Sequence, residues 1–338
     1  MRNLETSYMG ILLKSPVILG ACELTSKTDV LKRTEQEGVG AVVYKSIFEE
    51  QIQMDNLIHD EQLEEYNDIH AEMLTNHPNI DRSEIEHYLH QLRKAKESVS
   101  IPIIASLNAV NESSWIRYAS LIEETGVDGI ELNLYQTPTR FDLDSNAIEK
   151  QQIELVSKIK NRLSIPVSVK LSPDYTNILH FAHQLDHTGV DAMVMFNAFF
   201  QPDINIEKEK HKKSFNLSRR GDYKKSLRYA GMLHGRIEAD ICSSLGVFDG
   251  EDAIKLLLSG ATCVQVVSAV YKYGTSVISE INKTISEWME SKGYNSISDF
   301  EGKLSDMALN KNDSVIIYKR AQYIDLLLNS DTIFGEKL

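Results

Sequence analysis

Short apolar runs alternate with helical patterns along most of the chain. Eight of these runs predict buried strands, at residues 16–19, 41–44, 103–107, 130–134, 167–171, 193–196, 239–243 and 263–267. Helical patterns lie between them, among others at residues 114–124, 151–163, 177–187, 251–258 and 277–292. Strict alternation of strand and helix predicts a parallel sheet, and strands that are apolar throughout predict burial on both faces.

Glycines and prolines mark the borders of these elements. Several strands follow closely on a glycine that can end the preceding helix with a positive φ: Gly38, Gly126, Gly189 and Gly260. Two other strands are introduced by Ile101-Pro102 and Ile165-Pro166, and proline at a strand entry removes no ladder hydrogen bond. The borders therefore support the same alternation as the apolar runs.

Eight strand–helix units favour a closed (β/α)8 barrel, an α/β fold of the TIM-barrel type, which we expect to form one domain over residues 1–338. The rival architecture is an open, doubly wound sheet. We disfavour it because no G-x-G-x-x-G phrase follows the first strand, as a dinucleotide-binding sheet of that kind would suggest.

Two connections are much longer than the others. Residues 49–79 follow the second strand, and residues 201–225 follow the sixth. Both leave from C-terminal strand ends, the face on which barrel enzymes build their sites, so we expect two lids over a pocket. The basic stretch Lys208 to Lys213 is open to two interpretations, a solvated mobile surface or a patch that steers anions.

Polar residues stand at the ends of several buried strands, where an unpaired charge or amide would cost free energy. They are Lys45, Asn133, Lys170 and Asn197. If they converge at one barrel mouth, two ammonium groups and two amides suit a flat ligand rich in carbonyl groups. The alternative is that each lysine only reaches the rim with its charge in water and each asparagine only caps a turn.

Small residues after the last two strands predict an anion site. Residues 243–247 follow the seventh strand and residues 267–269 follow the eighth, each leading into a helix. Free N–H groups beside a helix N-terminus bind anions, and the loops after strands seven and eight are where barrels commonly hold phosphate. The same glycine and serines also fit plain tight turns.

Composition narrows the range of partners. With 36 basic and 49 acidic residues the net charge is -13, which disfavours nucleic acid. Cys22, Cys242 and Cys263 form no C-x-x-C pair, so we expect no disulfide framework and no metal site, and a reducing cytoplasm fits best. The chain shows no signal-like apolar start and no uncharged apolar run of about 18 residues, so a membrane is not expected as a partner.

Phrases spread over nearly the whole chain form a specific combination. They are SPVILGA, YKS, ELNL, VKLSP, FNA, GVFDGEDAIKLLLSGATCVQV and SKGYNSISDFEGKL. Together they resemble the dihydroorotate dehydrogenase family, and most closely its soluble, cytosolic branch. The resemblance implies a barrel that carries flavin mononucleotide (FMN), usually as a homodimer, and that oxidises a dihydropyrimidine by hydride transfer to the flavin. By the same resemblance, fumarate would be the electron acceptor.

The resemblance also implies roles for individual residues. Ala21 and Cys22 would lie against the flavin, and Lys45 would contact both flavin and substrate in a catalytic role. Lys170 would face the N1 and C2 carbonyl region of the flavin and stabilise negative charge there. Asn133 and Asn197 would bind the substrate, and Gly246 and Ser268 would hold the phosphate. The full implied cofactor set is Ala21, Cys22, Lys45, Ser46, Asn108, Asn133, Lys170, Asn197, Ser244, Gly246, Val267 and Ser268.

The loop that supplies the catalytic base departs from the family pattern. Where the family reads Ser-Cys-Pro-Asn, this chain reads Tyr135-Gln136-Thr137-Pro138. Gln136 thus stands at the position of the base cysteine, and an amide cannot serve as a general base. Thr137 or Tyr135, acting through water, is the weak substitute that the loop offers.

Other departures also fall near the substrate. Pro138 replaces an asparagine that grips the pyrimidine, Ala198 replaces a hydroxyl residue, and Leu245 stands for the first of two paired glycines. The family loop after the second strand has only residues 67–79 as its nearest counterpart. Retention of the flavin is therefore better supported than turnover of dihydroorotate.

Three functions follow from these observations. The first is an FMN-dependent oxidoreductase acting on dihydroorotate or a related dihydropyrimidine or cyclic amide. The second is a flavin-binding paralogue with little or no catalysis, which the changes at Gln136 and Pro138 favour. The third is a flavin-free aldolase or synthase that uses Lys45 or Lys170 as a Schiff-base amine.

Overall fold

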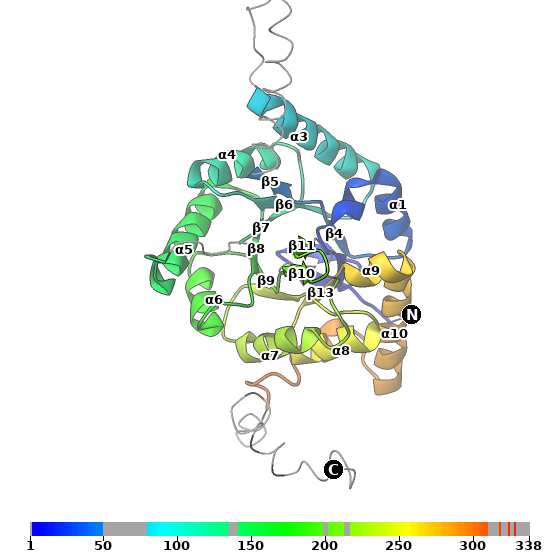
Figure 1. Cartoon of the computed structure of the whole chain (residues 1–338). Coiled ribbons are helices and arrows are strands. Elements are labelled where there is room, and N and C mark those ends of the chain that lie inside the picture. Colours follow the sequence, from blue (N-terminus) through cyan, green and yellow to red (C-terminus); the bar gives the residue numbers. More distant parts are fainter. Residues whose placement is uncertain are drawn as a thin grey trace, which may run out of the picture.

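The computed structural model describes residues 2–49, 80–134, 141–198, 202–212 and 217–309, together with the single residues 318, 324 and 328. Within these ranges a parallel sheet closes into a barrel (Figure 1). Its strands are β3 (Val17–Leu19), β4 (Ala41–Val43), β6 (Ile103–Asn108), β7 (Gly129–Asn133), β8 (Val167–Leu171), β9 (Ala192–Met195), β12 (Asp240–Ser243) and β13 (Cys263–Val266). The ring closes because β13 pairs with β3 and β4 pairs with β6. The predicted (β/α)8 barrel is confirmed, and the open-sheet alternative is wrong.

Helices surround this barrel on its outside (Figure 1). They are α1 (Thr28–Gln36), α3 (Ile80–Ser98), α4 (Glu112–Glu123), α5 (Ser145–Arg162), α6 (Ile178–Asp186), α7 (Tyr223–Leu233), α8 (Gly250–Ser259), α9 (Ser268–Tyr273) and α10 (Val277–Lys292), with short 3-10 turns at Glu23–Ser26 and Ile297–Asp299. The predicted helix-ending glycines all have positive φ, from +78° to +118°. Helix α5 begins earlier than its apolar pattern suggested, because Asp144 caps it by accepting a hydrogen bond from Ala147 N at 2.7 Å. Among the described residues, no helix is both long and apolar enough to span a membrane.

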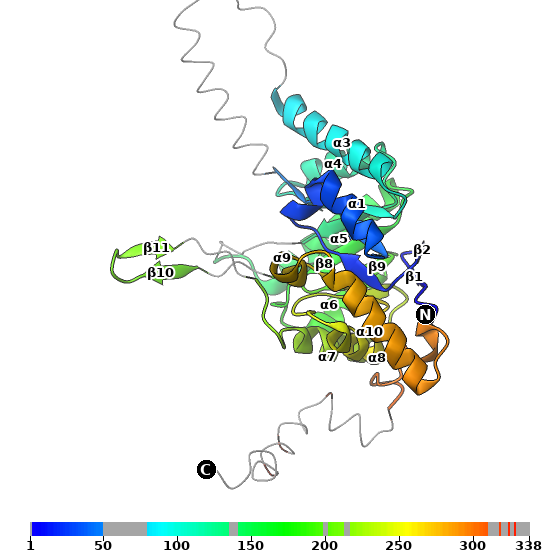
Figure 2. The ribbon, with the colours of Figure 1, turned by 90° about the vertical axis from the view of Figure 1, so that its right-hand side faces the viewer.

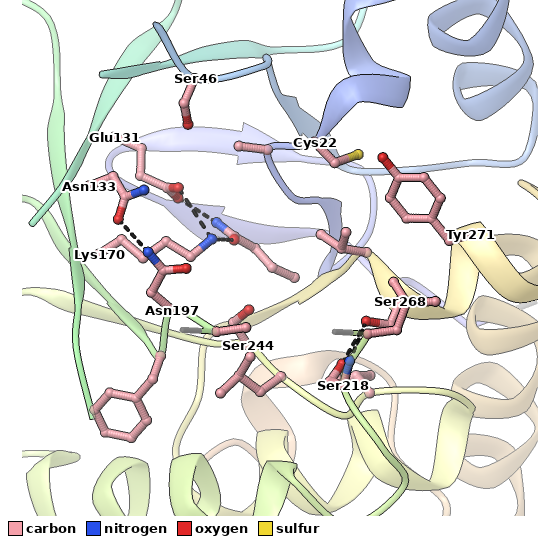
Figure 3. A pocket seen from close by; sticks show the side chains of 18 of the residues that line it. Cys22, Ser46, Glu131, Asn133, Lys170, Asn197, Ser218, Ser244, Ser268 and Tyr271 are labelled. Carbon is pink, nitrogen blue, oxygen red and sulfur yellow. Dashed lines mark hydrogen bonds and ion pairs between the residues drawn. The ribbon is translucent and has the colours of Figure 1, made fainter. Parts of the chain in front are cut away.

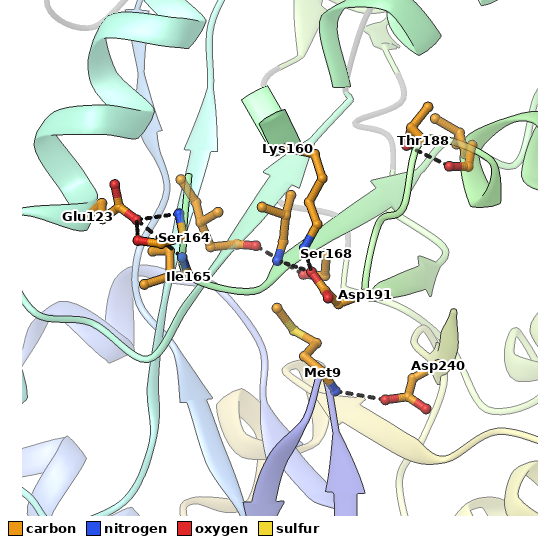
Figure 4. Close-up of polar contacts among 12 residues, drawn as sticks. Met9, Glu123, Lys160, Ser164, Ile165, Ser168, Thr188, Asp191 and Asp240 are labelled. Carbon is orange, nitrogen blue, oxygen red and sulfur yellow. Dashed lines mark hydrogen bonds and ion pairs between the residues drawn. The ribbon is translucent and has the colours of Figure 1, made fainter. Parts of the chain in front are cut away.

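The phrase Thr-Gly-Val-Asp occurs at residues 125–128 and 188–191, and both copies join neighbouring units at the N-terminal end of the barrel. Asp128 accepts a hydrogen bond from Ile103 N at 2.7 Å and pairs with Lys96 at 2.6 Å. Asp191 makes the corresponding contacts with Val167 N and with a lysine of α5 (Figure 4). Each carboxylate therefore ties the entry of one strand to the preceding strand and to the helix before it.

A hairpin that the sequence analysis did not predict covers the N-terminal end of the barrel. It consists of β1 (Thr6–Tyr8) and β2 (Ile11–Leu13). It lies opposite a second hairpin, formed by β10 (Asp203–Asn205) and β11 (Lys210–Lys212) (Figure 2). Met9 lies in the turn of the first hairpin, and its backbone N–H donates a hydrogen bond to the carboxylate of Asp240 at 2.7 Å (Figure 4). Tyr8 and Met9 pack on an apolar layer inside the barrel that includes Ile18 and Val194. This end of the barrel is therefore filled, and the opposite end is left for a site.

Of the two long connections, the structure describes part of the second and only Glu49 of the first. Residues 50–79 lie outside the described residues, so the expected lid there stays a prediction. Part of the second connection forms a hairpin, β10 (Asp203–Asn205) with β11 (Lys210–Lys212), which projects from the C-terminal face (Figure 2). Its lysines are exposed, and Lys212 pairs with Asp203 at 3.4 Å. The long connection over residues 201–225 thus contains a hairpin, and α7 already begins at Tyr223. Its expected role as a lid stays a prediction.

Candidate functional site

A pocket of about 390 Å³ lies at the C-terminal ends of the barrel strands. This volume is in the range of about 300–1,000 Å³ that is typical of small-molecule sites. Most residues predicted from the sequence line it: Ala21, Cys22, Lys45, Ser46, Asn133, Lys170, Asn197, Ser244, Gly246, Val267 and Ser268. Figure 3 shows them in two groups, with Lys170, Asn133 and Asn197 on one side and Ser268 on the other. The barrel therefore brings together groups that lie far apart in the sequence.

Lys170 is held at the floor of the pocket by two buried partners. Its Nζ lies 2.8 Å from Gln265 Oε1 and 3.5 Å from Glu131 Oε1. Gln265 Nε2 in turn donates to Glu131 Oε2 at 2.6 Å (Figure 3). The three residues are between 1% and 7% exposed. The Glu131 carboxylate and the Gln265 amide bind each other, and both contact the ammonium of Lys170. These contacts offset the free-energy cost of burying charged groups.

Asn133 and Asn197 form an amide pair beside Lys170. Asn197 Nδ2 donates to Asn133 Oδ1 at 2.7 Å (Figure 3). This bond uses the oxygen of one amide and a hydrogen of the other, so the pair still offers the NH2 group of Asn133 and the carbonyl oxygen of Asn197. A donor beside an acceptor matches the edge of a ring that carries adjacent C=O and N–H groups.

Lys45 lies at the open side of the pocket. Its Nζ lies 2.6 Å from Glu23 Oε2, and its backbone carbonyl accepts a hydrogen bond from the Tyr88 hydroxyl at 2.9 Å. The next residue, Ser46, shares a hydrogen bond of 2.6 Å with the hydroxyl of Ser106. Lys45 follows β4 and Glu23 follows β3, and these strands are neighbours in the barrel. The ion pair is therefore built from two adjacent strand ends.

The turn after β12 forms a concave group of backbone amides. Leu245 and Gly246 both have positive φ, +73° and +66°. Within the described ranges, no residue accepts a hydrogen bond from the backbone N–H of Leu245, Gly246 or Val247. Consecutive N–H groups in such a turn bind anions. Ser218 and Ser268, whose hydroxyls lie 2.7 Å apart, line the same end of the pocket (Figure 3).

Cys22 belongs to the wall of the pocket. Burial raises the pKa of its thiol more than hydrogen bonds from the backbone of Leu24 and Thr25 lower it. A raised pKa keeps the group in the thiol form near neutral pH. Cys22 thus contributes a small, uncharged surface and not a nucleophile.

Some predicted site residues do not line the pocket. Asn108 is buried behind it, where its Nδ2 donates to the backbone oxygen of Asn133 at 2.7 Å. Its position suits support of the asparagine pair, and a direct contact with a cofactor stays a prediction. Gln136 and Thr137 lie outside the described residues, as do Tyr135 and Pro138. Their predicted roles at the catalytic base therefore stay predictions as well.

Several residues of the pocket were not predicted from the sequence. Glu131 and Gln265 precede the strand ends by two positions or fewer, and a polar side chain within an apolar strand was a signal that could have found both. Glu23 and Ser218 lie on connections, and Tyr271 lies in the short helix α9, so no strand pattern marks any of them. In the described part of the chain, no group of three His, Cys, Asp or Glu side chains is arranged to hold a metal ion.

Fold and site together define a barrel whose pocket joins an anion-binding turn to a buried ammonium group and an amide pair, which is typical of a cofactor-dependent enzyme. A family model described as dihydroorotate dehydrogenase matches residues 3–289. This chain belongs to the dihydroorotate dehydrogenase family, whose members are flavin-dependent oxidoreductases.

Curated relatives support the same assignment at low identity. The chain is 28% identical over 306 residues to the dihydroorotate dehydrogenase B (NAD(+)) catalytic subunit of Thermoplasma volcanium, which covers 89% of this chain and 98% of the relative. It is 26% identical over 309 residues to the protein of that name from Methanothermobacter thermautotrophicus, and this match covers 90% of the present chain and 99% of the relative. The family assignment leaves the flavin-free aldolase or synthase without support.

Proposed function

We propose that this chain binds FMN in the pocket and oxidises a carbon–carbon bond of dihydroorotate or of a related dihydropyrimidine or cyclic amide. Family membership supports the general chemistry. The observation that carries the proposal is the arrangement of three features in one pocket: the amides of Leu245 to Val247, the ammonium of Lys170 and the asparagine pair.

The donor groups of the pocket fit FMN. The amides of the turn at Leu245 and Gly246 suit the phosphate, and the hydroxyls of Ser218 and Ser268 lie beside them. The ammonium of Lys170 suits the carbonyl side of a flavin ring, where negative charge develops. We propose Lys45, Ser46, Ser244 and Val267 as further contacts, as the family resemblance implies.

When bound, the flavin supplies the acceptor for a hydride from one ring carbon, while the neighbouring carbon loses a proton and the bond between them becomes double. The chain's residues would position the ring and stabilise charge. The NH2 group of Asn133 and the carbonyl oxygen of Asn197 would hold the amide edge of the substrate. Lys170, fixed by Glu131 and Gln265, would stabilise the negative charge that builds up during transfer.

Removal of the proton would have to proceed without the base cysteine of the family, because Gln136 stands at its position. Gln136 cannot act as a base, and Cys22 is held as a thiol, so neither replaces the missing cysteine. Loss of a general base lowers a rate by roughly 10²- to 10⁴-fold. We therefore expect slow oxidation, with Thr137 and water as the candidate route for the proton.

The electron acceptor and the assembly are also proposals. The resemblance implied fumarate and a homodimer, whereas the curated relatives carry NAD(+) in their names and are called catalytic subunits. We propose that the electrons leave to an acceptor outside this chain. A homodimer, and a location in the cytoplasm, would agree with the family pattern.

Anaerobic stopped-flow mixing of the FMN-loaded protein with dihydroorotate and a panel of cyclic amides tests the proposed function. We expect at least one compound to bleach the flavin absorbance, slowly and in proportion to its concentration. A flavin that no member of the panel reduces would favour the second function, a flavin-binding paralogue with little catalysis, for which the glutamine at position 136 already argues.

A further inference from the structure

The charges that line the pocket cancel. Among the described residues of its wall, the cationic side chains are Lys45 and Lys170, and the anionic side chains are Glu23 and Glu131. Each lysine contacts one of the two carboxylates, Lys45 with Glu23 at 2.6 Å and Lys170 with Glu131 at 3.5 Å. Each cation of the described wall is thus already paired with a carboxylate.

Of the two ion pairs, the one between Lys45 and Glu23 is the more accessible to a substrate that enters the pocket. Lys170 lies on the floor with its partners, whereas the side chain of Lys45 is 32% exposed and that of Glu23 is 61% exposed. The Tyr88 hydroxyl fixes the backbone of Lys45, and Glu23 opens a short 3-10 turn directly after the wall residue Cys22. The carboxylate therefore stands at the mouth of the pocket beside Lys45, the more exposed of the two lysines in its described wall.

This arrangement penalises a negatively charged substrate. A substrate carboxylate that approached Lys45 would also come close to the carboxylate of Glu23. The two negative charges would repel each other. An uncharged ring avoids this cost, because the ammonium of Lys45 has further hydrogens to donate to a ring carbonyl while it stays paired. The amide pair of Asn133 and Asn197 also recognises an uncharged edge.

We propose that the site selects uncharged cyclic amides of the dihydropyrimidine type over rings that carry a carboxylate, and that Glu23 determines this specificity by neutralising Lys45. The inference rests on the proposed function and narrows its substrate class. It makes dihydrouracil a better substrate than dihydroorotate, and uracil a better ligand than orotate.

Isothermal titration calorimetry of the FMN-loaded protein with uracil and with orotate tests this inference. We expect the wild-type protein to bind uracil at least 10-fold more tightly than orotate. Glu23→Gln, which removes one negative charge and keeps the shape, should shift the ratio of the two affinities toward orotate by at least 10-fold. Glu124→Gln, an equal charge change on the exposed end of α4, should leave the ratio as it is in the wild type.

The possible results separate this inference from the proposed function. FMN content is measured first by absorbance for each protein, and Glu23→Ala serves as a second variant with the same expected shift. Wild-type protein that holds no FMN contradicts the proposed function. Three results with FMN-loaded protein would overturn the selection by charge but not the proposed function. The wild-type protein could bind orotate as tightly as uracil, it could bind neither compound, or the ratio of the two affinities could stay the same in both Glu23 variants.

Discussion

The ammonium of Lys170 depends on a carboxylate and an amide that come from two other strands. Sequence reasoning identified Lys170, Asn133 and Asn197 because each is a polar residue at the end of a buried strand. Glu131 and Gln265 were not identified, because they lie within their strands and not at the ends. Their contacts join β7, β8 and β13, and such pairing across the barrel is visible only once the strands are closed into a ring.

Lys170→Met tests whether this cluster stabilises the fold. The change leaves the carboxylate of Glu131, which is 1% exposed, without its cation. Removing one partner of a buried ion pair costs about 3–5 kcal/mol, so we expect the free energy of unfolding to fall by that amount. Urea denaturation measures it. The double variant Lys170→Met with Glu131→Gln should recover most of the loss, and equal instability of both variants would contradict the explanation.

Glu301 provides a pH-dependent test far from the pocket. Burial raises the pKa of this carboxyl to about 7, against a lowering by the hydrogen bond that Thr262 donates at 3.0 Å. The folded protein therefore binds a proton that the unfolded chain has released, and this contribution to stability decreases as the pH rises from about 4.5 to above 7.

Glu301→Gln should remove that dependence. At pH 8 the wild-type protein contains a charged, largely buried carboxylate, so we expect the variant to be more stable by on the order of 1–2 kcal/mol. At pH 5 the difference should be much smaller, because the wild-type carboxyl is then protonated. Chemical denaturation of both proteins at the two pH values measures the difference in the free energy of unfolding. A difference that is the same at pH 5 and pH 8 would contradict the explanation.

At the scale of elements, the sequence predicted the strands of the barrel well because each is a run of apolar residues, and most of these runs follow a glycine or a proline. The hairpins β1–β2 and β10–β11 were missed. Their strands have only three residues each, and the sequence Asp203–Asn205 paired with Lys210–Lys212 is mostly polar. Local patterns carry little information on such short strands, which form through pairing and, for the first hairpin, through packing on the barrel.

The turn after β12 links an element to the proposed cofactor. Gly246→Ala would put a Cβ atom 2.7 Å from Tyr223 N and 2.8 Å from Arg219 O, in addition to the strain of its φ of +66°. We expect the turn to shift and the affinity for FMN to fall at least 10-fold, as measured by titration of the flavin fluorescence.

Gly189→Ala is the matched control for that change. Gly189 has a φ of +78°, but a Cβ there meets no atom within 4 Å, and the residue lies at the other end of the barrel after α6. It should lower stability by about 1–2 kcal/mol through the left-handed conformation and leave FMN affinity unaltered. Equal loss of FMN affinity in both variants would show that the turn has no specific role.

At the scale of the whole molecule, closure of the barrel is what turns separate residues into a site. One end is filled by the hairpin β1–β2, and the other end holds the pocket to which seven of the strands and their following loops contribute side chains. The sequence could predict this face from the count of strands. It could not predict that Glu23 would reach Lys45, because that contact depends on the path of a connection and not on a repeating pattern.

Binding of FMN to the purified protein is the most direct test of the proposed cofactor site. The protein is reconstituted with excess FMN, freed of unbound flavin by gel filtration, and its absorbance spectrum gives the ratio of flavin to chain. We predict one FMN per chain and a shifted spectrum relative to free FMN. Well-folded protein that retains none, with a circular dichroism spectrum typical of an intact α/β fold, would contradict the account.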